Sequence, residues 1–112
     1  MTEIPFGKGK FRIAGTNFEV SECGEGSRLD ERAIPPGSVF RTRRDGDVFT
    51  KFGGGTKSLG DWLTDKKVPV GRRDKLVVLA HGNRVLAVVG MEISDAVKVV
   101  DGSKVVVIKE EI

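Results

Sequence analysis

Cysteine is nearly absent from this 112-residue chain, with Cys23 as its single example. One cysteine excludes an internal disulfide framework and any metal site built from several cysteines, and it fits a reducing cytosol. We expect the Cys23 side chain to be buried or half-buried, because nothing near it in the sequence would activate a thiol. Histidine is equally scarce, and we interpret the single His81 as a turn residue.

Long apolar runs are missing as well. No segment approaches the ~20 residues that a membrane-spanning helix requires, and the N-terminus lacks the apolar stretch of a secretory signal. The chain is therefore predicted to be cytoplasmic, with no membrane partner. The sequence also shows no metal-ligand spacing and no nucleophile–base arrangement. We therefore predict no catalytic residue, no metal site and no cofactor in this chain, and the oligomeric state stays open.

Glycine is abundant, at 15 residues, and valine-rich stretches recur along the chain. β-Branched side chains favour strands, and glycine-containing turns favour hairpins. Four hairpins are predicted, with turns at residues 15–17, 45–46, 81–83 and 101–103, and residues 22–32 are predicted to form a loop. The fold class that follows is α+β, in one domain over residues 1–112: a mostly antiparallel β-sheet built from hairpins with one packed helix.

The predicted helix covers residues 57–66. Leu59, Trp62 and Leu63 are spaced i, i+3 and i+4, which places one apolar stripe on the helix. Trp62 is therefore predicted to belong to the core before it serves as a stacking platform for a base. Pro69 ends the helix, because the residue before a proline is pushed out of the α region.

Positive charge is concentrated in the middle of the chain. Residues 38–75 hold ten basic and five acidic side chains, a net charge of +5, whereas the segments on either side each carry a net charge of −1. A local basic patch is typical of nucleic-acid-binding domains. A solvated charged face is the equally weighted alternative.

A glycine run stands directly before the predicted helix. Gly53, Gly54 and Gly55 would let an anion approach the backbone near the helix N-terminus, and Lys57 would add a full charge. The run departs from the phosphate-binding P-loop pattern, because no glycine directly precedes Lys57. The alternative is a glycine turn followed by a helix capped by Thr56.

Further basic residues extend this candidate site. Arg41 and Arg43 are two residues apart and so would project from one face of a strand. Lys66, Arg72 and Arg73 follow the predicted helix, in a cluster completed by Lys67 and Lys75. Asp61 and Asp65 lie four residues apart on the helix, and we interpret them as ion-pair partners of nearby lysines.

Four segments in order resemble the C-terminal domain of bacterial tRNA(Ile)-lysidine synthetases. They read F-R-T-R-R-D-G-D-V-F, G-T-K-S-L-G-D-W-L-T-D-K-K-V-P, R-R-D-K-L-V-V-L and V-V-G-M-E-I-S-D. Residues 38–112 carry these motifs. Gly60 stands where that family has a second lysine, and Val77 stands where it has a proline.

The resemblance implies a role in tRNA modification. The full enzymes use ATP to join lysine to the wobble cytidine of an isoleucine tRNA, and an N-terminal domain absent from this sequence binds ATP and Mg. This chain would then be a fragment of a longer enzyme, a non-catalytic accessory domain whose partners are tRNA and the catalytic domain of the same polypeptide. By matched motif, the implied RNA contacts are Arg41, Arg43, Lys57, Lys66, Arg72 and Arg73. Asp47, Asp61 and Asp74 would orient these basic groups or cap turns.

A second function class is a protein–protein or interdomain docking module without direct RNA contact. Exposed strand edges and valine-rich hairpins could pair with another domain. The salt dependence of binding distinguishes the RNA-binding function from the docking function. Affinity for phosphates falls steeply as the salt concentration rises, whereas the affinity of apolar docking does not.

Overall fold

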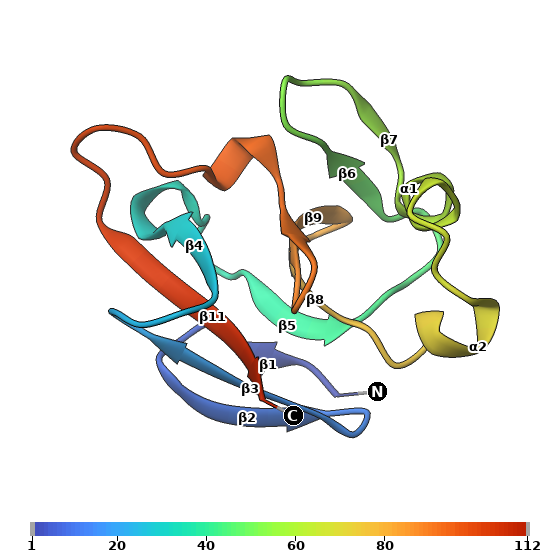
Figure 1. Cartoon of the computed structure of the whole chain (residues 1–112), viewed down its shortest axis with the longest axis horizontal. Coiled ribbons are helices and arrows are strands. Elements are labelled where there is room, and N and C mark those ends of the chain that lie inside the picture. The colour runs from blue at the N-terminus through green and yellow to red at the C-terminus, as the bar shows by residue number, and fades with distance from the viewer. Residues whose placement is uncertain (1, 112) are drawn as a thin grey trace.

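Two β-sheets make up most of this computed structural model, which describes residues 2–111 (Figure 1). The smaller sheet has the strand order β2-β3-β11-β4. Its strands are β2 (Gly9–Ile13), β3 (Thr16–Ser21), β4 (Ser27–Asp30) and β11 (Val105–Glu111). The sheet joins the two ends of the described chain, because β11 lies between β3 and β4 and is antiparallel to both.

The larger sheet has the order β1-β5-β8-β9-β6-β7, and β10 also pairs with β9. All of its pairings are antiparallel except that between β6 and β9. Its strands are β1 (Ile4–Pro5), β5 (Val39–Thr42), β6 (Val48–Thr50), β7 (Thr56–Ser58), β8 (Val77–His81), β9 (Arg84–Val88) and β10 (Glu92–Ile93). The mostly antiparallel α+β fold class is therefore confirmed, with two sheets where one was predicted.

Two hydrophobic clusters hold these layers together. The first joins the two sheets, where Phe18 of β3 and Phe40 of β5 are fully buried with ring centroids 4.8 Å apart. The second lies between the larger sheet and α1 (Leu59–Asp65). There Trp62 is 2% exposed, and its ring centroid lies 4.7 Å from that of Phe49 in β6. The prediction that Trp62 is a core residue is confirmed.

The helix is shorter than the predicted 57–66 segment. Residues 57 and 58 belong to β7, and the Ser58 side chain accepts a hydrogen bond from the Asp61 N–H, so the helix cap is Ser58 and not Thr56. A second short helix, α2 (Val70–Arg73), follows Pro69, which takes its N-cap position with an extended backbone. Two 3-10 turns, η1 (Glu31–Ala33) and η2 (Asp95–Val97), complete the fold.

Of the four predicted hairpins, two are confirmed. Strands β8 and β9 pair around Gly82 and Asn83, with His81 exposed at the end of β8. Strands β2 and β3 also pair, but their turn is Ala14-Gly15, one position before the predicted one, and both of these residues have positive φ. Positive φ at both central positions is the geometry of the tight turn that matches strand twist.

The other two predicted hairpins are wrong. The strands on either side of Asp45-Gly46 do not pair with each other, since β5 pairs with β1 and β8 while β6 pairs with β7 and β9. Around residues 101–103, β11 pairs with β3 and β4 instead of with the segment before the turn. In both places burial against distant strands outweighs a locally favourable turn.

The segment 22–32 is not simply a loop, because it contains β4 and the start of η1. Gly26, with φ of 139°, allows the chain to approach β11 so closely that a side-chain carbon would lie 2.5 Å from the Ile108 carbonyl oxygen. The glycine that indicated a loop therefore serves strand pairing. Cys23 is exposed, which corrects the expectation that it is buried or half-buried.

Candidate nucleic-acid interface

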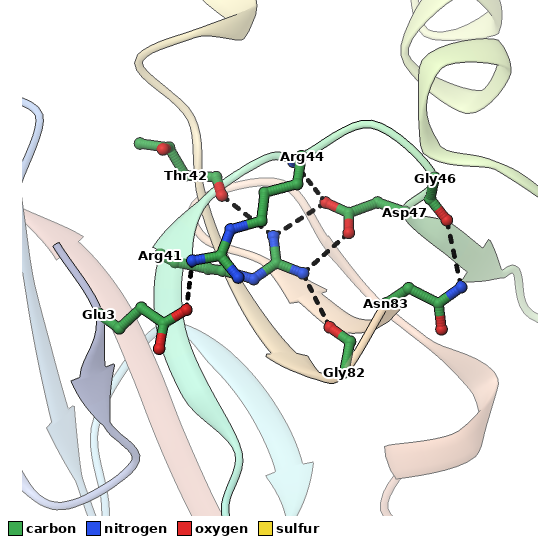
Figure 2. A network of polar contacts seen from close by, with 8 residues as sticks. All are labelled: Glu3, Arg41, Thr42, Arg44, Gly46, Asp47, Gly82 and Asn83. Atoms are coloured by element: carbon green, nitrogen blue, oxygen red, sulfur yellow. Dashed lines mark hydrogen bonds and ion pairs between the residues drawn. The ribbon is translucent and has the colours of Figure 1, made fainter. Parts of the chain in front are cut away.

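Arg41 is a structural residue and not an exposed RNA contact. Its side chain is 3% exposed and forms a two-fold ion pair with Asp47, Nη1 to Oδ2 at 2.9 Å and Nη2 to Oδ1 at 2.8 Å (Figure 2). The same guanidinium donates to the carbonyl oxygens of Thr42 and Gly82. The hydrogen bond to Gly82 connects β5 to the β8–β9 turn. The inclusion of Arg41 among the RNA contacts is therefore corrected, because its donors are satisfied inside the protein.

Asp47 has the orienting role that was predicted for it. Besides holding Arg41, its Oδ2 accepts the backbone N–H of Arg44 at 2.7 Å, which closes the loop between β5 and β6. The Asn83 side chain donates to the Gly46 carbonyl oxygen in the same network (Figure 2). The loop is thereby fixed from both sides.

The glycine run does not form the predicted anion site at a helix start. Gly53, Gly54 and Gly55 turn β6 into β7, and strand β7 then separates them from α1. All three have φ between 85° and 91°, which explains glycine here as the residue that tolerates a left-handed backbone. The glycines make a hairpin tip, and the helix N-terminus is capped by Ser58.

The remaining predicted contacts lie on β7, α1, α2 and the loop after β5. Three of them have an acidic partner: Lys57 pairs with Asp65, Lys66 with Glu92 at 3.1 Å, and Arg43 with Asp74 at 3.1 Å. The Lys57 ammonium group donates to Asp65 and lies close to it, so the pKa of that carboxyl group lies below its usual value. The Asp65 carboxylate neutralises part of the positive charge of this region.

Arg72 and Arg73 differ in role although they are neighbours. The Arg73 Nε donates to the Val68 carbonyl oxygen at 3.0 Å, and its Nη2 lies 3.3 Å from the Thr64 hydroxyl, so Arg73 braces α2 against α1. Arg72 is exposed and has no ion pair within residues 2–111. Of the two, Arg72 is the one whose charge is free to meet a phosphate.

Lys67 occupies an unusual position at the end of α1. Its φ is 59°, in the left-handed region that glycine normally fills at a helix C-terminus. The Val68 N–H donates to the Leu63 carbonyl oxygen and the Lys67 N–H to that of Thr64, the paired bonds of a Schellman motif. This turn leaves Lys67 exposed, with no ion-pair partner in the described part of the chain.

An open hollow of about 400 Å³ brings together side chains of the β6–β7 hairpin, α1 and β10. Its lining residues are Lys51, Phe52, Lys57, Trp62, Asp65, Lys66 and Glu92. Three lysines face two carboxylates there, and the Lys66 ammonium lies 5.7 Å from the centre of the Trp62 ring. Phe52 is 54% exposed at the rim. Lysines beside the exposed Phe52 ring suit a phosphate and a stacked base of single-stranded or frayed RNA, whereas the Trp62 ring is buried.

Sequence reasoning missed Lys51 and Phe52 as parts of this site. They precede the glycine run directly, so the signal was a cationic and aromatic pair at a hairpin tip. Asp74 pairs with Arg43, which is the orienting role expected of it. The Asp61 carboxylate has no ion pair within residues 2–111, so the expectation that it pairs with a nearby lysine is wrong. Only its backbone N–H takes part in the helix cap, by donating to the Ser58 hydroxyl.

The described residues contain no cluster of three or more metal-ligating side chains. Within residues 2–111 the helices are all too short to cross a membrane.

Comparison with known proteins places this geometry in context. A family model described as the TilS substrate C-terminal domain matches residues 39–109. A tRNA(Ile)-lysidine synthase of Caldanaerobacter subterraneus subsp. tengcongensis is 34% identical over 109 residues, which is 92% of this chain and 23% of that protein. The tRNA(Ile)-lysidine synthase of Clostridium tetani is 39% identical over 67 residues, 59% of this chain and 14% of that protein. The chain thus spans less than a quarter of the length of these relatives.

The fold has a counterpart among solved structures. A crystal structure of a TilS C-terminal domain superposes with a TM-score of 0.77, covering 98% of this chain and 95% of the other at 20% identity. That likeness concerns the fold, whereas the family model concerns the sequence and covers well over half of the residues. The chain therefore belongs to the family of TilS substrate C-terminal domains.

Proposed function

We propose that this chain is the tRNA-binding accessory domain of a cytoplasmic tRNA(Ile)-lysidine synthetase, the enzyme that attaches lysine to the wobble cytidine of an isoleucine tRNA. The chain itself holds RNA and performs no chemistry. ATP and Mg belong, in this proposal, to a catalytic domain of the same polypeptide, which is also its second partner. The family match supports the parent enzyme, and the charged surface supports the RNA contact.

The observation that carries the RNA contact is a set of exposed basic side chains without acidic partners along one edge of the molecule. Lys51 lies at the tip of the β6–β7 hairpin, Lys67 at the end of α1, and Arg72 in α2 (Figure 1). None of the three has an ion pair within residues 2–111. Unneutralised charge on one edge creates a directional field that attracts a polyanion.

A phosphate-based mode of binding follows from the kind of RNA involved. Double-stranded regions of tRNA are A-form, and their deep groove hides the base edges from side chains. Lysine and arginine on this edge would therefore contact backbone phosphates and read shape, with Lys57, Lys66 and Arg43 contributing once their carboxylate partners are displaced.

The test is filter binding of tRNA to the chain at several salt concentrations. We expect the logarithm of the binding constant to fall linearly with the logarithm of the salt concentration. Each phosphate contact that a variant loses should make this slope shallower by about 0.7–0.9. Arg72→Ala and Lys51→Ala should each weaken binding to all tRNAs while circular dichroism shows an unchanged fold.

Lys109→Ala is the matched control, because it removes one exposed lysine from β11 in the other sheet. It should leave both affinity and slope close to those of the wild type. Binding that is undetectable at low salt, that does not respond to salt, or that falls equally in all three variants would contradict the proposed interface.

A docking module is the second candidate function, and one surface favours it. A hollow of about 500 Å³ beside η2 contains the exposed Phe52 and Val99, and Val100 next to Val99 is 54% exposed. Apolar side chains gathered at one place on a soluble domain often mark an interaction site. In this case the catalytic domain would bind the chain with an affinity that does not depend on salt concentration. Val99→Ser, which changes a residue of this hollow outside the lysine-lined one, would weaken that binding and leave tRNA binding by the Arg72 edge unchanged.

A further inference from the structure

A second cavity lies on the opposite face of the β6–β7 hairpin from the lysine-lined hollow. Thr50 and Thr56 line it, whereas Phe49 and Lys57, one residue away on each strand, face α1. This alternation follows from the pleat of a β-strand. The cavity measures about 180 Å³, and its other walls come from η1, the β8–β9 hairpin and the segment before β11.

The charge in this cavity is positive and uncompensated. His81 and Arg84 are directly opposite each other across the β8–β9 hairpin, so their side chains lie on the same face, and both line the cavity. Arg84 has no ion pair within residues 2–111, and no aspartate or glutamate lines the cavity. Arg84 therefore brings a positive charge to the cavity that no lining carboxylate balances.

Three hydroxyl groups are the other polar groups of the lining, and its remaining six residues are apolar: Ala33, Pro35, Val48, Val85, Leu86 and Ala96. The Thr50 and Thr56 hydroxyl oxygens are 2.8 Å apart, so one of the two hydrogens is used between them and the other is free for a ligand. Ser94 is 1% exposed, and its hydroxyl oxygen accepts from the Ala96 N–H at 3.2 Å. Its own hydrogen therefore remains to be donated in a buried position.

We propose that this cavity binds a phosphate group, with Arg84 neutralising its charge and with the His81 ring and the Thr50, Thr56 and Ser94 hydroxyls donating hydrogen bonds to its oxygens. Guanidinium groups bind phosphate oxygens with two parallel hydrogen bonds. The volume is smaller than the 300–1,000 Å³ or so of pockets that enclose drug-sized ligands, so the site takes the phosphate group itself and leaves the rest of the ligand outside. That phosphate belongs either to RNA or to the free anion.

The experiment is a titration of the ¹⁵N-labelled full chain with inorganic phosphate, followed by two-dimensional NMR, with sodium chloride added to the reference at equal ionic strength. We expect saturable shifts at the amides of Thr50, Thr56, Arg84 and Ser94. Arg84→Met should weaken phosphate binding by roughly tenfold or more, since it removes a charged hydrogen-bond donor. His81→Gln tests the second donor by an independent change, and each variant's spectrum shows directly whether it is folded.

Lys109→Met serves as the control, because it removes the same charge from a distant strand and should leave the dissociation constant unchanged. A second titration with tRNA separates the two sources of phosphate. Shifts at the same four amides assign the site to an RNA phosphate, and shifts with inorganic phosphate alone assign it to the free anion.

Absence of saturable shifts at these amides with both ligands, or equal phosphate affinity of a folded Arg84→Met variant, would overturn the assignment. Because inorganic phosphate is the first probe, the site stands or falls independently of tRNA binding by the opposite face of the hairpin.

Discussion

The guanidinium of Arg41 and the carboxylate of Asp47 form a two-fold ion pair inside the fold, with their side chains 3% and 2% exposed. Two residues further along, Arg43 forms a single contact with Asp74, whose side chain is 82% exposed. Two arginines only two positions apart therefore occupy different environments. The first pair connects β5, the loop before β6 and the β8–β9 turn (Figure 2). The second pair joins a half-buried Arg43 to an exposed carboxylate.

Replacing Arg41 by alanine should lower the free energy of unfolding by about 3–5 kcal/mol, because it leaves the Asp47 carboxylate buried without its partner. Arg43→Ala is the matched control and should change stability by less than about 1 kcal/mol, as surface ion pairs do. Urea denaturation of the two variants measures both quantities. Equal stabilities of the two variants would show that burial of the Arg41 pair does not govern the fold.

Trp62→Ala should cost about 3–5 kcal/mol, since it opens a cavity between α1 and the larger sheet beside Phe49. Val70→Ala is a suitable comparison, because Val70 is 76% exposed and should alter stability by less than about 0.5 kcal/mol. Thermal melts report both. A Trp62→Ala variant that melts normally and loses tRNA binding would instead identify the indole as a stacking surface.

Lys67→Gly should raise stability and weaken tRNA binding at the same time. A left-handed backbone costs a non-glycine residue about 1–2 kcal/mol, so glycine should stabilise the domain by about 1 kcal/mol. The variant also removes an exposed cation from the proposed interface. Denaturation and filter binding measure the two effects on the same sample.

Lys66→Gly provides the comparison, because Lys66 has φ of −82° and gives glycine no conformational advantage. If Lys67→Gly stabilises the chain and leaves tRNA affinity at the wild-type value, Lys67 is not a phosphate contact.

Asp65→Asn should increase tRNA affinity, whereas Lys57→Ala should decrease it. The Asp65 carboxylate is charged at neutral pH, as an ordinary aspartate is, and it neutralises the Lys57 ammonium group with which it pairs. Removing that charge frees the lysine to contact one more phosphate. The slope of log binding constant against log salt concentration should then become steeper by up to about 0.7–0.9. Filter binding across a salt series measures the change.

Asp101→Asn controls for net charge, because it removes one exposed carboxylate from the turn before β11. An equal gain in affinity from both aspartate variants would mean that net charge, and not the Lys57 site, determines binding.

Local sequence determined those parts of the molecule whose partners are close along the chain. The Leu59, Trp62 and Leu63 spacing defines a helix face without reference to anything distant, and that face is buried as predicted. The β8–β9 hairpin follows from two valine-rich runs joined by a short turn. The excess of basic residues in 38–75 is likewise a property of composition. In each case the physical cause acts over a few residues.

Tertiary structure decided which basic residues remain available to a ligand. The two-residue spacing of Arg41 and Arg43 predicts a shared face, but β5 ends at Thr42, so only Arg41 is held by the sheet and enclosed by the β8–β9 turn. Lys57 pairs with a carboxylate eight residues away and Lys66 pairs with Glu92 of β10, while Arg72 has no ion pair in the described chain. Tertiary structure also decided the strand partners. A turn sequence such as Asp45-Gly46 stabilises a hairpin less than β5 is stabilised by burial against strands more than thirty residues away. Burial and pairing depend on these long-range contacts, and residue type at a single position does not encode them.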